Sequence, residues 1–74
     1  MSDHVYKKIE ITGTSSEGQD DAIRQAIKRA SETVKGMSWF EVVESRGRIT
    51  DGKIDQFQVT LILQRRIGSS RAVS

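Results

Sequence analysis

The feature that most constrains the fold is a pair of strand-like segments joined by the dipeptide Asp51-Gly52. Residues about 56–66 alternate apolar with polar side chains, which is typical of a β-strand, and residues 39–49 are predicted to form the longest strand, with apolar side chains on both of its faces. Asp-Gly between two such segments favours a tight turn, because both turn positions accept a positive φ. The sequence therefore predicts a long β-hairpin in its C-terminal half.

This turn also predicts a register for the hairpin. If Asp51 and Gly52 form a two-residue loop, Thr50 faces Lys53 and the earlier pairs follow. One face then carries the pairs Phe40–Leu63, Val42–Leu61 and Glu44–Val59, and the other carries Trp39–Gln64, Glu41–Ile62, Val43–Thr60 and Ser45–Gln58. We expect a helix to cover the first face, and the second, mixed face to serve as an assembly interface or a binding site.

A helix is predicted before the hairpin. Ser16 and Gln19 fit a capping box, in which each side chain satisfies a free backbone N–H of the first turn. From there an apolar stripe at helical spacing continues to about Lys35. Gly36 is well placed as the left-handed residue that stops the helix.

A further strand is predicted over residues 5–12, where apolar and polar side chains again alternate, and Gly13 is expected to end it. The order of elements is then β-α-β-β. We therefore predict an α+β fold in which a three-stranded antiparallel sheet packs on one helix, as a single domain over residues 1–74.

The small size of the chain limits its core. A domain of 74 residues buries only about 60% of the surface that its unfolded chain exposes. The chain has no cysteine and only one histidine, His4, so neither disulfides nor a zinc site can supplement that core. Assembly or a bound ligand remains. No leader pattern or membrane-spanning segment is evident in the sequence, so we expect a cytoplasmic protein without membrane contact.

The net charge of +2 is unevenly distributed. Residues 1–64 carry nine Lys and Arg against all ten Asp and Glu, and Arg65, Arg66 and Arg71 supply the excess. A basic stripe with interleaved aromatics, the usual sign of a nucleic-acid binder, is therefore missing. A small nucleic-acid-binding or protein-interaction module remains the alternative function. Residues 68–74 are rich in Gly and Ser, and we expect a disordered tail there.

Trp39 is the only tryptophan of the chain. A single tryptophan in a small domain is more often a core residue, but the register places Trp39 on the face opposite Phe40. An indole left in water would forgo the burial of roughly 150–250 Å², so we expect a partner chain or a planar ligand over it. Gln58 lies on the same face, and its amide offers a donor and an acceptor to a heteroaromatic edge.

Several segments together resemble the bacterial members of the dodecin family. They are Tyr6-Lys7-Lys8-Ile9-Glu10-Ile11-Thr12-Gly13-Thr14-Ser15, Ala22-Ile23, Arg29-Ala30, Trp39-Phe40-Glu41-Val42, Arg46-Gly47 and Phe57-Gln58-Val59. The resemblance runs from about Tyr6 to Arg66 and keeps the spacing of every element. It implies a hollow homododecamer that binds flavins in pairs between subunits, each ring stacked between a tryptophan and a second flavin.

The resemblance also implies roles for particular residues. Trp39 is the stacking residue, Gln58 bonds the pyrimidine edge of the ring, and Arg46 neutralises the phosphate of FMN. Arg48 and Arg66 are further candidates near the flavin side chain. Riboflavin is an alternative ligand, and coenzyme A at subunit junctions is a further one that no residue assigns. The last strand departs from the family's common Gly-Phe-Arg-Leu ending, which leaves the direction of Arg66 open.

No catalytic centre is predicted. The chain lacks the usual pairs of nucleophile and base, and Glu41 and Glu44 point to opposite faces of one strand. The resemblance then makes storage and photoprotection of FMN the preferred hypothesis over an enzyme. Six strand positions place Trp39 and Gln58 roughly 20 Å apart, so a flavin that touches both would draw them from different subunits.

Overall fold

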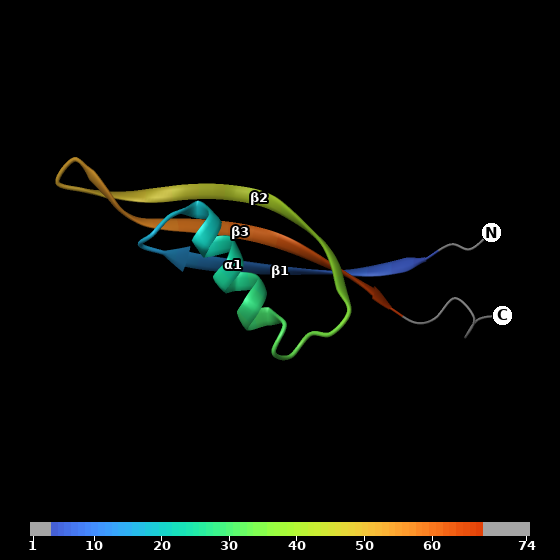
Figure 1. The fold of residues 1–74 in the computed structure, drawn as a ribbon. Coiled ribbons are helices and arrows are strands. Elements are labelled where there is room, and N and C mark those ends of the chain that lie inside the picture. The colour runs from blue at the N-terminus through green and yellow to red at the C-terminus, as the bar shows by residue number, and fades with distance from the viewer. Residues whose placement is uncertain (1–3, 68–74) are drawn as a thin grey trace.

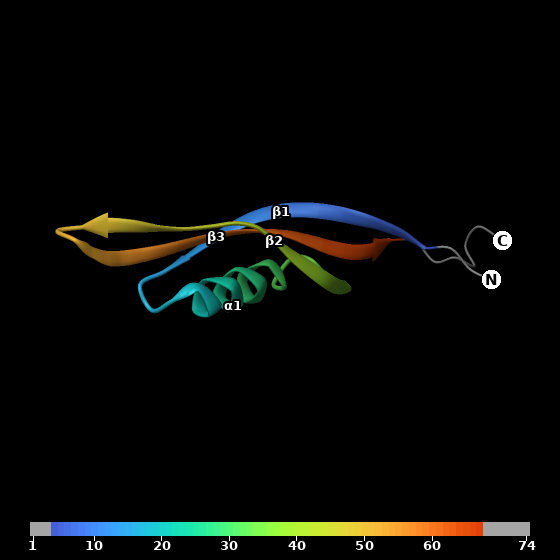
Figure 2. The same cartoon turned by 90° about the horizontal axis from the view of Figure 1, so that it is seen from above.

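The computed structural model describes residues 4–67. Their four elements are β1 (Val5–Ser15), α1 (Gln19–Ala30), β2 (Met37–Thr50) and β3 (Lys53–Ile67). The strands form one antiparallel sheet in the order β1-β3-β2. Helix α1 lies on one face of this sheet and the opposite face is open (Figures 1 and 2). The predicted α+β fold and its β-α-β-β order are confirmed, whereas the expectation for residues 68–74 lies outside the described residues.

The core lies between α1 and the β1–β3 half of the sheet. Its buried apolar side chains are Ala22, Ala26, Val59, Leu61 and Leu63. Helix α1 packs mainly on β1 and β3, because a helix about 10 Å wide covers two strands spaced about 4.8 Å apart. The third strand therefore extends beyond the cover that the helix provides.

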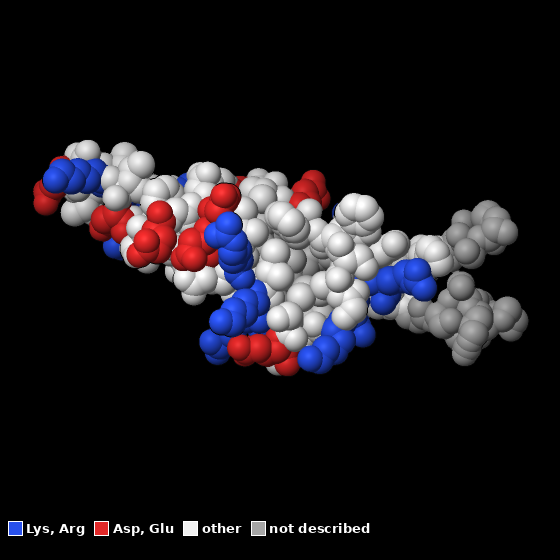
Figure 3. All heavy atoms as spheres, viewed as in Figure 1, with Lys and Arg blue, Asp and Glu red and all other residues white. Residues whose placement is uncertain are grey.

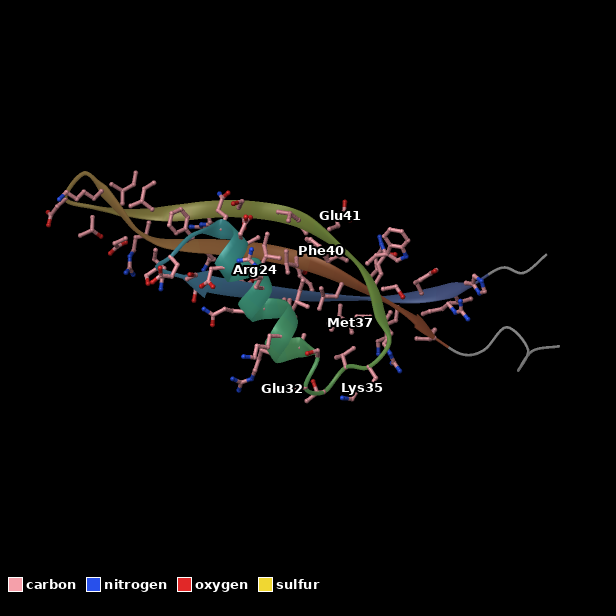
Figure 4. The ribbon with its side chains drawn as sticks, in the orientation of Figure 1. Arg24, Glu32, Lys35, Met37, Phe40 and Glu41 are labelled. Carbon is pink, nitrogen blue, oxygen red and sulfur yellow. The ribbon has the colours of Figure 1, made fainter. Side chains whose placement is uncertain are left out.

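Strand β2 is the uncovered strand. Phe40 and Val42, which we expected the helix to bury, remain 50% and 44% exposed. That expectation is wrong, because β3 and not β2 is the central strand beneath α1. In Figure 4, Phe40 and Met37 lie beside α1 and not under it. The sheet therefore leaves apolar side chains uncovered on the helix side as well as on the open side.

Gly13 does not end the first strand, which continues to Ser15. A Cβ at Gly13 would lie 2.5 Å from the carbonyl oxygen of Ala22 and 2.8 Å from the Cβ of Ala26. Contacts this short are not sterically allowed, so a side chain at this position would push α1 off the sheet. Gly13 therefore allows the close approach of helix and strand instead of marking a turn.

The predicted capping box is wrong. Helix α1 begins after Gly18, and no side chain among the described residues caps it. Instead the Ser15 hydroxyl donates to Oδ2 of Asp21 at 2.6 Å and accepts from the backbone N–H of Glu17 at 2.9 Å. The bond from Ser15, followed by one from Gln25, lowers the pKa of Asp21. The end of β1 is thereby joined to the first turn of the helix.

The helix is also shorter than predicted. It ends at Ala30, and turns follow, with the Val34 N–H donating to the Ala30 carbonyl at 2.8 Å. Gly36 has the predicted positive φ of 77°, but it leads the chain into β2 and does not cap the helix. The apolar stripe extends beyond the end of the helix, because hydrogen-bonded turns after Ala30 can continue the helical spacing of apolar residues.

The hairpin turn is confirmed, since Asp51 and Gly52 have φ values of 53° and 75°. The predicted register holds near both ends of the hairpin but fails in its middle. There Glu44 faces Thr60, Ser45 faces Val59 and Arg46 faces Gln58. One register shift, between Val42 and Glu44, adds a residue to β2, and another, beside Arg48, adds one to β3. The two β-bulges compensate, so the pairs beyond them return to the predicted register.

Candidate functional site

Two groups of predicted site residues lie along the open face of the sheet. Because Val59, Leu61 and Leu63 face the helix, the alternate positions of β3 face away from it. Gln58 therefore lies on the open face, as predicted. Trp39 pairs with Gln64 of the same face, so its predicted place is also confirmed.

Trp39 is 65% exposed. Besides its place opposite Gln64, it borders a hollow of about 110 Å³ that Ile27, Met37 and Phe40 line from the helix side. The indole thus stands at the outer edge of the sheet, where both faces are accessible. Figure 3, which views the helix side, shows uncharged surface beside α1 and charged side chains around the helix itself.

The bulge in β2 decides where Arg46 points. In an unbroken strand Arg46 would share a face with Phe40 and Val42, on the helix side. The extra residue at Val43 reverses this alternation, so that Arg46 pairs directly with Gln58 on the open face. The structure therefore brings together two predicted site residues that the predicted register had placed on opposite faces.

A hydrogen bond to the helix supports this reversal. The Gln19 side chain donates from Nε2 to Oγ of Ser45 at 2.5 Å. Ser45 was predicted on the open face opposite Gln58, yet it faces Val59 and contacts α1. Since neighbouring strand residues point to opposite faces, Ser45 toward the helix places Arg46 away from it. The signal that sequence reasoning missed is the bulge, which has no clear pattern of its own in the sequence.

Arg48 has a specific partner. Its Nε donates to Oδ1 of Asp55 at 3.0 Å and its Nη2 donates to Oδ2 at 3.1 Å, while the Thr50 hydroxyl donates to Oδ2 at 3.0 Å. The bond from Arg48 is the main reason that the pKa of Asp55 is lowered, and the same pairing raises the pKa of Arg48. This bidentate pair was not predicted.

A hollow of about 370 Å³ lies at this end of the open face. Its lining residues are Arg46, Gly47, Arg48, Gln56 and Gln58. Two guanidinium groups and two amides give it hydrogen-bond donors suited to phosphate oxygens and to the polar edge of a ring. Within residues 4–67, Arg46 makes no ion pair, so its guanidinium can accept an anionic ligand.

The aromatic and cationic parts of the site are far apart in one chain. Trp39 pairs with Gln64, six positions along β3 from Gln58, which corresponds to roughly 20 Å. Arg66 lies at the Trp39 end: it is exposed and pairs with Tyr6 of β1. It shares the open face with Gln64, which settles its direction despite the altered ending of the last strand.

Within residues 4–67, no group of three or more His, Cys, Asp or Glu side chains gathers at one point. No helix of that part of the chain is both long and apolar enough to cross a membrane.

The comparisons of this chain with known proteins all point to the same family. The family model described as Dodecin matches residues 5–66. A curated dodecin from Thermus thermophilus is 47% identical over 57 residues, which are 77% of this chain and 83% of that protein. Coenzyme A, which the resemblance allowed, finds no support in these proteins or in the described residues, and we do not propose it.

Solved structures agree. A dodecin from Streptomyces davaonensis superposes with a TM-score of 0.83 at 48% identity, covering 92% of this chain and 100% of its own. A dodecin from Streptomyces coelicolor gives a TM-score of 0.84 at 45% identity, covering 93% of this chain and 99% of its own. Both the sequence and the arrangement of the four elements are therefore shared.

Proposed function

This chain belongs to the dodecin family, and from that premise we propose that it binds and stores FMN in the cytoplasm, between the subunits of a hollow homododecamer. The observation that carries the proposal is the direct pairing of Arg46 with Gln58 on the open face. That pair offers a guanidinium, which makes no ion pair within residues 4–67, for a phosphate beside an amide for a ring edge. The exposed indole of Trp39 offers the stacking surface.

The spacing of these groups supports a shared site. Trp39 and Gln58 lie roughly 20 Å apart along one hairpin, whereas an isoalloxazine ring is much shorter than that. In our proposal Trp39 of one subunit and Gln58 of another contact the same flavin. The uncovered apolar side chains of β2, such as Phe40 and Val42, are the surface that the assembly would bury.

Each residue has a stated part in the proposed site. Trp39 stacks on the ring and quenches its excited state, Gln58 bonds its pyrimidine edge, and Arg46 binds the phosphate. Arg66 adds positive charge at the Trp39 end, and Arg48 borders the hollow beside Arg46. Riboflavin carries the same ring without the phosphate and is the second ligand to be tried. We propose binding and photoprotection instead of catalysis, because these contacts hold a flavin without presenting a base or a nucleophile to a substrate.

Titration with FMN tests the proposal. Added FMN should lose fluorescence on binding and should quench the indole of Trp39. Trp39→Ala should weaken binding by about 10- to 100-fold, the range found when a stacking aromatic is removed. Trp39→Phe is the matched control, since it keeps a smaller ring at the same position and should give an intermediate affinity.

Two results would contradict the proposal. The first is flavin fluorescence that does not change with added protein, which would favour the alternative of a protein-interaction or nucleic-acid-binding module. The second is a stable monomer in light scattering, because a site shared between subunits needs the assembled particle.

A further inference from the structure

Asp55 is the extra residue of the bulge in β3. Arg48 pairs with Gln56 and Ile49 pairs with Ile54, so Asp55 has no partner of its own in the ladder. A bulge commonly redirects a side chain. Here it turns the carboxylate of Asp55 toward Arg48, and both carboxylate oxygens are used in the contacts with Arg48 and Thr50.

The two arginines of the hollow differ in their partners. Both Arg46 and Arg48 line it, two positions apart on β2. Arg48 is held by Asp55 through two parallel hydrogen bonds, while within residues 4–67 Arg46 makes no ion pair. The charge of Asp55 offsets that of Arg48, so the hollow offers one uncompensated cation instead of two.

A carboxylate and a phosphate compete for the same guanidinium. Both fit its planar fork through two parallel hydrogen bonds. Asp55 is covalently tethered beside Arg48, so it competes at an effective concentration of the order of millimolar or above. A phosphate that approached Arg48 would also meet the negative charge of Asp55, which disfavours its entry on that side.

We propose that Asp55 withholds Arg48 from phosphate binding and thereby sets how strongly this protein prefers phosphorylated to unphosphorylated flavin. The inference rests on the proposed function, since it concerns the same site. With Asp55 in place, the phosphate gains the contact with Arg46 alone. The chain therefore discriminates only moderately between FMN and riboflavin.

Asp55→Asn tests this inference, with Asp51→Asn as the matched control. Both substitutions remove one negative charge from the hairpin, but only Asp55 contacts Arg48. Asp51 has a positive φ of 53°, which asparagine also accepts, so the control keeps the turn. The measured quantity is the ratio of the FMN and riboflavin dissociation constants.

The expected change is specific to Asp55. Asp55→Asn should shift the ratio about threefold to fivefold in favour of FMN, the upper end of the scale of an exposed charge pair, while Asp51→Asn should shift it less than about twofold. Adding Arg48→Gln to Asp55→Asn should abolish the gain, because the released guanidinium is then missing. An unchanged ratio in Asp55→Asn would overturn the inference, as would a gain that survives the second substitution or an equal gain in Asp51→Asn.

A readout without flavin separates this inference from the proposed function. Inorganic phosphate added to the wild-type protein should shift the NMR signal of the Arg46 side-chain Nε–H and leave that of Arg48 in place. In Asp55→Asn both signals should shift. If the wild type bound no flavin, the proposed function would fail, yet this experiment would still decide the role of Asp55. A shift of the Arg48 signal in the wild type would overturn it.

Discussion

Strands β2 and β3 are two arms of one hairpin, yet they have opposite environments. Strand β3 holds the buried side chains Val59, Leu61 and Leu63. Strand β2 pairs with it along the hairpin but buries none of its own apolar side chains. The difference arises because β3 is the central strand under the helix, while β2 is an edge strand beyond it. Strand β3 therefore stabilises the single subunit, and β2 presents surface to whatever binds it.

The hairpin end adds a second contrast. There β2 supplies the two arginines of the hollow, and β3 supplies the groups beside them. Within residues 4–67 the arginine opposite Gln58 makes no ion pair, whereas Asp55 binds Arg48. The bulge of β2 near Val43 turns Arg46 to the open face, and the bulge of β3 turns Asp55 toward Arg48. These two irregular positions of the hairpin thus place side chains of the site.

The largest expected effect is a difference in the free energy of unfolding between variants of β3 and variants of β2. Leu61→Ala should lower the free energy of unfolding by about 2–5 kcal/mol, because Leu61 is fully buried. Val42, which faces Leu61 across the ladder, is the matched control, and Val42→Ala should cost less than about 1 kcal/mol in separated subunits. Denaturant unfolding followed by circular dichroism measures both. Equal losses in separated subunits would break the comparison, since β2 would then belong to the core.

A smaller effect concerns Arg46 of β2. Arg46→Gln should weaken FMN binding by roughly 10- to 100-fold, the range for a lost hydrogen bond to a charged group. Riboflavin has no phosphate, so its affinity should stay within about twofold. Fluorescence titration with both ligands provides the measurement and its internal control. An equal loss for both flavins would mean that Arg46 supports the fold of the hairpin and not the phosphate.

The smallest effect is a change in acidity on β3. Because Arg48 lowers the pKa of Asp55, the pair stabilises the fold above the ordinary aspartate value of about 3.9, and this contribution is lost as the pH falls through the lowered folded pKa. Arg48→Gln should raise the pKa of Asp55 toward its ordinary value. NMR titration of the Asp55 carboxyl measures this change. A pKa that Arg48→Gln leaves unaltered would show that the pair does not persist in solution.

Much of the fold was predictable because it depends on local patterns. The alternation in the strands, the helical stripe and the Asp51-Gly52 turn each act over a few residues, and all of them predicted the correct type of element. Helix ends were predicted less well. The stripe continues past Ala30 into turns, and Ser15 satisfied the backbone near the helix start in place of the predicted capping box.

The site was predictable only in part. Trp39 and Gln58 were placed on the correct face by alternation alone. Arg46 was identified as a site residue from the family resemblance. The predicted register placed it on the helix side, because no sequence pattern indicates the bulge near Val43. The pairing of Asp55 with Arg48 was also not predicted, because it depends on the second bulge. An aspartate close to a turn would otherwise be expected to face solvent.

By itself the sequence determined the order of the elements, the turn of the hairpin and which side chains alternate along each strand, because these follow from the geometry of the backbone. The tertiary structure alone decided that β3 would be central, that β2 would remain uncovered, and that two bulges would turn Arg46 toward Gln58 and Asp55 toward Arg48. The physical reason is that pairing and packing compete over the whole sheet. A helix that is two strands wide can cover only two of the three strands. One extra residue in a strand reverses the direction of every side chain beyond it, until a second bulge restores the register.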